Sequence, residues 1–272
     1  MTPLLLLVVL IPFAGAVLAA PLPARAIRTL ATAAALITAT LAVAASWLAF
    51  PGTYRAGLLS LEWLGDGRGE GLFGVLIDPL GTVLLLVATV IGFLTILYST
   101  RYLRERNREH PVGEEHQGRF YFWMLAFLGS MAGVATAPNF LQLFVFWELT
   151  TVCSLALISF YRSEKSLRAG FKAILMTHAG GLFFLIALLV LFAQTGSFDF
   201  DAPSRLQGPL RGWVYVFFLI AAWSKAAQVP FHTWLPDAME APTPVSAYLH
   251  AASMVKAGVF LMARAVSSGW AM

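Results

Sequence analysis

Eight apolar segments in this chain are each close to the length needed to cross the hydrocarbon core of a membrane. A helix that spans this core needs about 20 consecutive apolar residues. The 272 residues are 59% hydrophobic and only 12% charged, whereas a soluble domain carries about 25% charged residues. We therefore predict an all-α polytopic membrane protein with about eight transmembrane helices. The predicted segments are Leu4–Ala20, Ile27–Phe50, Pro79–Ser99, Phe120–Ala137, Phe140–Tyr161, Phe171–Gln194, Gly212–Val229 and Thr243–Ala263.

The first segment also has features of a secretory signal peptide, because LAAPLPARA resembles a cleavage region. A signal peptide begins with a basic stretch, which this chain lacks. We therefore expect the segment to be retained as a helix.

Composition argues against several other functions. The net charge of +4 accompanies a strongly apolar chain and does not indicate nucleic-acid binding. Cys153 is the single cysteine, so the chain has no intrachain disulfide and no CxxC pair. His110 and His116 lie six residues apart in a charged loop. Their spacing does not match a zinc-binding motif, so we expect a solvated loop rather than a metal site. We predict no metal, no cofactor and no redox chemistry by this chain alone.

Basic residues in the loops predict the orientation of the chain. Eleven lysines and arginines lie in the three loops that follow odd-numbered segments, against five on the other side. Cytoplasmic loops carry the excess of positive charge, so the amino terminus is expected outside the plasma membrane. The glycine-rich segment 51–78 then forms an external cap with room for a short hairpin.

The stretch 223–264 places several ionisable side chains at membrane depth. It contains Lys225, His232, His250 and Lys256. A lysine near the centre of a spanning helix costs about 2.5–3.5 kcal/mol on insertion, so it needs a partner or a water-filled cavity. Pro230 has no amide hydrogen and would break a helix that ran through it. We therefore predict a hydrated ion path at Lys225; the alternative is that the lysines reach the headgroups from helix ends.

Two further polar residues lie in other apolar segments. Glu148 is close to mid-depth, and Lys225 is its obvious charge partner; a neutral structural carboxyl is the alternative. His178 precedes Gly180 and Gly181, and either a packing role or a functional role is compatible with this position. In a regular helix, His250 and Lys256 point about 120° apart, so they share a face only if the helix is distorted.

Several stretches resemble a known superfamily of membrane subunits. They are IDPLGTVLLLVATVIGFLTILYSTRYL, FVFWELTTVCSLALISFY and above all WSKAAQVPFHTWLPDAMEAPTPVSAYLHAASMVKAGVFLMAR. The superfamily comprises the antiporter-like subunits of respiratory complex I, of membrane-bound hydrogenases and of Mrp-type cation/proton antiporters. Lysine within HAASMVKAG and the run MTHAGGLFF are more similar to the large A subunit of Mrp antiporters than to the complex I subunits.

The resemblance implies a proton-transfer chain along the middle of the membrane. Its members would be Glu148, Lys225, His250 and Lys256, with the Glu148–Lys225 pair as an electrostatic switch. It implies a proton-translocating subunit of a multisubunit Na⁺/H⁺ antiporter, with other membrane subunits as partners. The alternatives are a proton-pumping subunit of a quinone oxidoreductase or membrane hydrogenase, and a structural membrane anchor.

The family pattern also predicts how the chain is divided. Family members contain two inverted repeats, and this sequence matches the peripheral helices and the first repeat only. Residues 1–119 are expected to form peripheral helices and loops, and residues 120–272 a five-helix proton-channel repeat. The missing second repeat indicates a fragment or a half-length protein that needs a partner.

Overall fold

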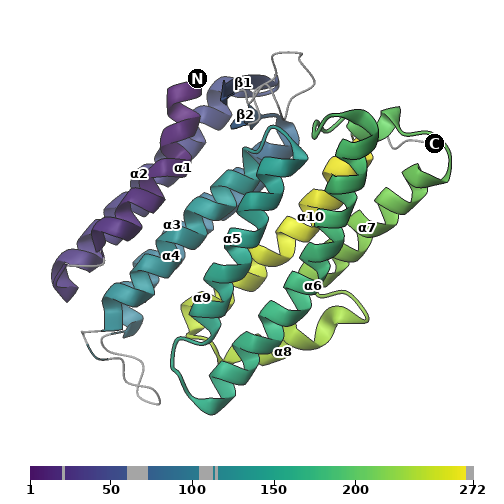
Figure 1. The fold of residues 1–272 in the computed structure, drawn as a ribbon. Coiled ribbons are helices and arrows are strands. Elements are labelled where there is room, and N and C mark those ends of the chain that lie inside the picture. The colour runs from purple at the N-terminus through teal and green to yellow at the C-terminus, as the bar shows by residue number, and fades with distance from the viewer. Residues whose placement is uncertain (20–21, 60–72, 104–112, 114–115, 268–272) are drawn as a thin grey trace.

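The computed structural model describes residues 1–19, 22–59, 73–103, 113 and 116–267. It is a helical bundle with a small two-stranded sheet at one end (Figure 1). The long helices are α1 (Thr2–Ala19), α2 (Ala24–Ala49), α3 (Pro79–Arg101), α4 (Gln117–Ala135), α5 (Phe140–Ile158), α6 (Glu164–Thr195), α7 (Pro209–Lys225), α9 (Thr243–Ala251) and α10 (Met254–Ala265). The short elements are β1 (Tyr54–Leu59), β2 (Phe73–Ile77), α8 (Trp234–Asp237) and the 3₁₀ turns Ala202–Arg205, Phe231–Thr233 and Ala238–Glu240.

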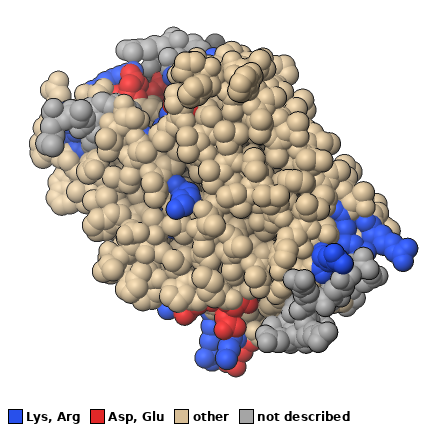
Figure 2. Space-filling model, turned by 180° about the vertical axis from the view of Figure 1, so that it is seen from behind, with Lys and Arg blue, Asp and Glu red and all other residues tan. Residues whose placement is uncertain are grey.

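The predicted all-helical membrane architecture is confirmed. Within the described residues, six helical segments are long and apolar enough to cross a membrane, with the broken α9–α10 segment counted as one. Helices α4 and α7 are not among the six, so the count of eight spans stays a prediction. Figure 2 shows a broad face with most of its lysine, arginine, aspartate and glutamate side chains at the two ends and one basic side chain near the middle. Charged side chains are costly in the hydrocarbon core, so this distribution suits a bilayer.

Side-chain caps fix where several of the helices begin. Asp78, Asn139 and Ser163 each accept a hydrogen bond from a backbone amide three residues on, at the starts of α3, α5 and α6. These bonds satisfy amides that have no partner inside the helix. At the other end of α6, Gly196 adopts a left-handed conformation (φ 68°), which glycine accepts without strain.

The cap predicted for segment 51–78 does contain a hairpin. β1 and β2 pair antiparallel, and residues 60–72 between them lie outside the described part of the chain. The hairpin is fastened to the bundle at two points. The Leu76 amide donates to the Thr136 carbonyl (2.8 Å). The Gln142 amide group bonds both the amide and the carbonyl of Gly74, each at 2.9 Å.

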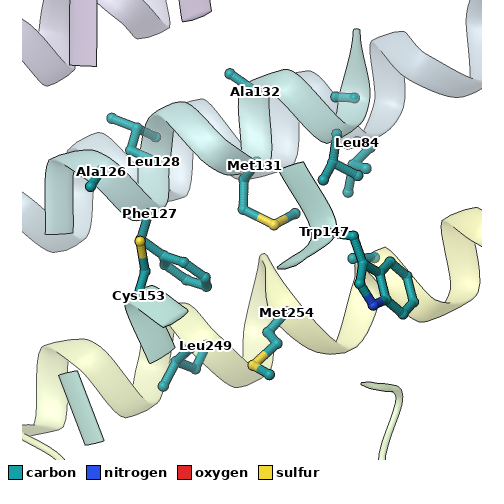
Figure 3. Close-up of a cluster of buried hydrophobic side chains, with 14 of the residues drawn as sticks. Leu84, Ala126, Phe127, Leu128, Met131, Ala132, Trp147, Cys153, Leu249 and Met254 are labelled. Carbon is teal, nitrogen blue, oxygen red and sulfur yellow. The ribbon is translucent and has the colours of Figure 1, made fainter. Parts of the chain in front are cut away.

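Helix α4 forms the centre of the bundle, where it packs against α1, α2, α3 and α5. Most of its side chains are buried, on all faces. Figure 3 shows part of this core, in which side chains from α4 meet others from α3, α5 and the α9–α10 segment. The labelled residues include Phe127, Met131, Trp147, Leu249 and Met254, all fully buried. This apolar packing holds α5 and α9 in fixed positions beside each other.

Two of the predicted helices differ from the structure, the seventh at its end and the eighth in its interior. The seventh ends at Lys225, five residues before Pro230, because Ala227 adopts a left-handed conformation (φ 51°) that a helix cannot contain. The eighth is interrupted at Ala252 and Ser253, between α9 and α10. There the Tyr248 carbonyl accepts from both the Ser253 hydroxyl (2.6 Å) and the Ala252 amide (3.3 Å).

Candidate functional site

The centre of the candidate site is Lys225, the last residue of α7. Its side chain is fully buried against α5. The Nζ donates to the Trp147 carbonyl (2.9 Å) and to the Thr151 hydroxyl (2.5 Å), and it lies 4.9 Å from the centre of the Trp147 ring. A buried ammonium needs such acceptors, and a ring face adds an electrostatic attraction. The predicted burial of Lys225 at a helix break is therefore present.

The neighbours of Lys225 hold the end of α7 in place. The indole of Trp234, in α8, donates to the Ser224 carbonyl (3.0 Å), at the end of the helix. The Ser224 hydroxyl donates to the Met176 carbonyl of α6 (3.1 Å). The chain that follows the break thus folds back and closes the exposed end of α7.

Glu148 lies on α5 beside the residues that bind Lys225, but its carboxylate turns to a different partner. Its Oε2 is 2.7 Å from Nδ1 of His178 on α6. Within the described part of the chain, no ion pair joins Glu148 to Lys225. The expected direct pair is therefore absent from this conformation. Helical geometry gives the reason: Trp147 and Thr151 share one face of α5, whereas Glu148 points about 100° away, towards α6.

Two adjacent glycines on α6 make room for this arrangement. A Cβ on Gly181 would lie 2.1 Å from Oε1 of Glu148, and a Cβ on Gly180 would lie 2.0 Å from the Ser224 hydroxyl. Any other residue at these positions would displace those side chains. Oε1 of Glu148 is buried and has no hydrogen-bond partner among the described residues. Such an orphaned carboxylate oxygen is uncommon and marks a position that can take up a proton or a new donor.

His178 forms the outer side of this group, since its side chain is 54% exposed while that of Glu148 is 20% exposed. It lies near the middle of α6, a helix of 32 residues. An exposed imidazole at this depth is unfavourable against lipid, so it indicates contact with water or protein. The sequence left the role of His178 open, and the structure joins it to Glu148. The signal that could have located it was the HAGG run, which combines a titratable side chain with close helix packing.

The other two predicted residues lie on either side of the break in the eighth segment. His250, in the last turn of α9, is half-buried, and neither ring nitrogen has a hydrogen-bond partner among the described residues. Lys256 is exposed on α10, at the rim of a cavity of about 270 Å³ that it lines with Leu80 and Phe260. Among the described residues, no hydrogen bond joins either of them to Lys225. His232 is exposed in the turn after Pro230 and takes no part in the site.

The chain matches two known protein families. Residues 137–269 match the family described as "NADH:quinone oxidoreductase/Mrp antiporter, TM". Residues 63–121 match "NADH-Ubiquinone oxidoreductase (complex I), chain 5 N-terminus". The chain belongs to the antiporter-like subunit family. The matched regions of this antiporter-like chain contain every residue of the candidate site.

Among curated proteins, the antiporter-like chain is 44% identical over 209 residues to the "Na(+)/H(+) antiporter subunit A1" of Staphylococcus epidermidis. It is 41% identical over 209 residues to the protein of that name from Staphylococcus aureus. Each alignment covers 73% of this chain and 25% of the relative. The antiporter-like chain thus matches about a quarter of the length of these relatives.

Two solved structures share the fold. The Mrp complex from Dietzia sp. DQ12-45-1b contains a chain that superposes with a TM-score of 0.79 at 33% identity, covering 94% of this chain and 27% of that one. A chain of the membrane-bound sulfane sulfur reductase, an archaeal respiratory membrane complex, gives a TM-score of 0.75 at 21% identity, covering 97% and 53%. The second likeness concerns the fold alone.

Proton transfer is the chemistry that this group of the antiporter-like chain can perform. Carboxylate, imidazole and amine side chains lie along α5, α6, α7 and the α9–α10 segment, and each can gain or lose a proton. Within the residues that the structure describes, no cluster of histidine, cysteine and carboxylate side chains is suited to a metal ion. Cys153 is buried in the core beside α4 and has no neighbouring cysteine.

Proposed function

We propose that this chain is the proton-translocating part of a membrane subunit of a multisubunit Na⁺/H⁺ antiporter. The observation that carries the proposal is the fully buried Lys225 at the end of an interrupted helix, next to a carboxylate with an alternative partner. A buried amine of this kind is retained at a cost in stability, which a role in moving charge explains. The names of the relatives favour exchange of Na⁺ for H⁺ over a respiratory role.

The proposed pathway runs between the ionisable groups in order. His178 exchanges a proton with the outside of the bundle and passes it to Glu148. When Glu148 turns from His178 towards Lys225, the carboxylate attracts the ammonium charge, and when it turns back the lysine releases its proton onwards. His250 and Lys256 continue the path through the break between α9 and α10. The change of partner by Glu148 is thus the switch that the family resemblance implies.

The organisation of the subunit follows from the same proposal. Residues 1–119 form the peripheral helices and residues 120–272 the five-helix repeat that conducts protons. The amino terminus faces the outside of the plasma membrane, because the basic loops favour the cytoplasmic side. The partners are other membrane subunits of the antiporter, and the subunit itself performs no redox chemistry.

The test is Na⁺-dependent dissipation of a pH gradient in everted membrane vesicles. The chain is expressed alone and together with the products of its neighbouring genes, in cells that lack their own Na⁺/H⁺ antiporters. We expect dissipation when the neighbours are present. If Na⁺ never changes the gradient and the native membrane links this chain to quinone reduction, the respiratory alternative is correct. A chain that only retains its partners in the membrane, with no ion response and no electron transfer, would be a structural anchor.

The glycine beside Glu148 provides a prediction for this assay. Gly181→Ala places a methyl group where Oε1 of Glu148 lies. The carboxylate ends a flexible side chain, so we expect it to move away from His178 while α6 keeps its position. Misplacing a reacting group by about 1 Å can cost up to 100-fold in rate, and we expect at least about a tenfold loss of flux.

The control is another helical glycine. A Cβ on Gly212, in α7, would meet no atom within 4 Å. Gly212→Ala should therefore leave the flux unchanged. His178→Gln keeps a hydrogen-bond donor but cannot exchange a proton, so it should reduce the flux as Gly181→Ala does. Unaltered flux in both the Gly181→Ala and the His178→Gln variants would exclude the proposed Glu148 switch.

A further inference from the structure

A basic hollow lies at the end of the bundle where α2 begins and α3 ends. It has a volume of about 830 Å³ and is open on one side. Arg25 and Arg28 contribute to it from the first turns of α2, and Arg101 from the last turn of α3. Basic side chains gather at this corner of the molecule in Figure 2. Three guanidinium groups from two helices surround one space that none of the proposed proton-transfer residues lines.

The polar lining suits a phosphate group. Arginine presents a planar set of donors that matches phosphate oxygens, and threonine hydroxyls add further donors. Thr29 and Thr32 line the same wall as the arginines. The Thr29 hydroxyl donates to the Arg25 carbonyl (3.2 Å), so Thr32 is the one of the two whose hydroxyl can donate to a ligand. Arg28 also donates to Oε1 of Gln117 at 2.9 Å, which ties its side chain to the start of α4. The hollow therefore has an ordered cationic wall with hydroxyl groups beside it.

Along α2, the lining of the hollow changes from basic to apolar. Along α2, its lining residues follow at helical spacing from Arg25 through Thr29 and Thr32 to Leu36. Residues three and four apart lie on one face of a helix, so this is a single stripe. It changes from cationic to hydroxyl to apolar over about three turns, and Leu36 is 48% exposed. A ligand that matches the whole stripe has an anionic head and an apolar tail.

We propose that this hollow binds the phosphate headgroup of an anionic phospholipid, whose acyl chain lies along α2 beside Leu36. The position agrees with this ligand, because the ends of membrane-spanning helices lie at the depth of the headgroups. Basic pockets between such helices recognise acidic lipids, and each arginine near the surface adds appreciably to the attraction. A soluble phosphate would use the arginines but would gain nothing from the apolar end of the stripe.

The experiment measures lipid binding by native mass spectrometry of the full chain, purified with any subunits that accompany it. The probes are dioleoyl phosphatidylglycerol, dioleoyl phosphatidylcholine and inorganic phosphate. We expect phosphatidylglycerol to bind in preference to phosphatidylcholine. Removing two charges with Arg25→Gln and Arg101→Gln should weaken phosphatidylglycerol by about 30-fold. Leu36→Ser, at an exposed site, should weaken it by about fivefold and leave the binding of phosphate unaltered.

The matched control is Arg168→Gln. Arg168 is an exposed arginine in the second turn of α6, where it pairs with Glu164 (2.5 Å), so losing it removes one positive charge elsewhere, as Arg25→Gln alone does in the hollow. We expect its lipid binding to equal that of the unmodified protein. Equal binding of the two lipids, displacement by millimolar phosphate, or an equal loss in Arg168→Gln would each overturn the proposal. If the double variant does not accumulate, Arg25→Gln alone and Leu36→Ser decide the matter.

Discussion

Replacing Lys225 with methionine should abolish proton flux through this subunit while leaving its fold intact. Methionine has nearly the length of lysine and no charge, so it fills the buried space against Trp147. The Thr151 hydroxyl already donates to the Trp147 carbonyl of its own helix (3.3 Å), so it keeps a partner when the amine is lost. Positioned proton-transfer groups contribute about 100-fold or more to a rate, which sets the expected loss. The measurement is the Na⁺-dependent decay of the pH gradient in everted vesicles.

Two further variants make this prediction specific. Lys225→Arg keeps the charge but should still impair the flux, because arginine stays protonated and cannot release its proton. Lys165→Met removes a lysine that is exposed in the first turn of α6. We expect its flux to equal that of the unmodified protein. Wild-type flux from the Lys225→Met variant would contradict the pathway proposed above.

Replacing Arg264 with glutamine should destabilise the protein by about 3–5 kcal/mol, the cost of breaking a buried ion pair. The Arg264 guanidinium binds both carboxylate oxygens of Asp78 and lies 4.9 Å from the ring centres of Phe200 and Phe260. The Arg264 side chain is only 5% exposed. The pair joins the end of α10 to the start of α3, so its loss leaves a part-buried carboxylate that keeps only the bond from the Gly81 amide (2.7 Å) among the described residues. Thermal unfolding of the purified chain in mild detergent measures the effect.

The control for this variant is an exposed pair with similar geometry. Arg168→Gln breaks a contact with Glu164 that is 79% exposed on both sides, and such pairs contribute only about 0.2–1 kcal/mol. Unfolding midpoints that fall equally in the two variants would show that the buried pair has no special importance.

The same pair gives stability a dependence on pH. Burial alone would raise the pKa of the Asp78 carboxyl, but hydrogen bonds and charge from Arg264 outweigh it, so the pKa lies below its usual value. A carboxyl whose pKa is lowered by folding stabilises the protein above its unfolded pKa. This contribution is lost as the pH falls through the folded pKa. The Arg264→Gln variant should therefore lose less stability on acidification than the unmodified protein.

Apolar length and side-chain chemistry were enough to predict most of the fold and the centre of the site. Each predicted span falls largely within helix, because 20 or so apolar residues in a bilayer have few alternatives to a helix. The burial of Lys225 and the hairpin in segment 51–78 were also predicted. These features depend on residues that lie close together in the chain, so they can be read from the sequence.

The features that were missed depend on rotation about helix axes and on contacts between distant segments. The Glu148–Lys225 pair was predicted from membrane depth and from the family resemblance, and neither says that Glu148 faces α6 in this conformation. The break at Ala252 and Ser253 contains no glycine or proline, the residues that usually predict the end of a helix. At the break the Ser253 hydroxyl bonds to the Tyr248 carbonyl, a contact that a regular helical pattern does not reveal. The pairing of His178 with Glu148 required knowledge of which faces of α5 and α6 meet.

The double hydrogen bond between Gln142 and Gly74 has a mechanical consequence. It fixes the height of α5 relative to the hairpin, and Glu148 follows six residues later on the same rigid rod, about 9 Å along the axis. The position of the hairpin therefore determines how deep the Glu148 carboxylate lies in the bundle. If the hairpin were displaced, these two bonds would carry α5 with it. The distances from Glu148 to His178 and to Lys225 would then change together.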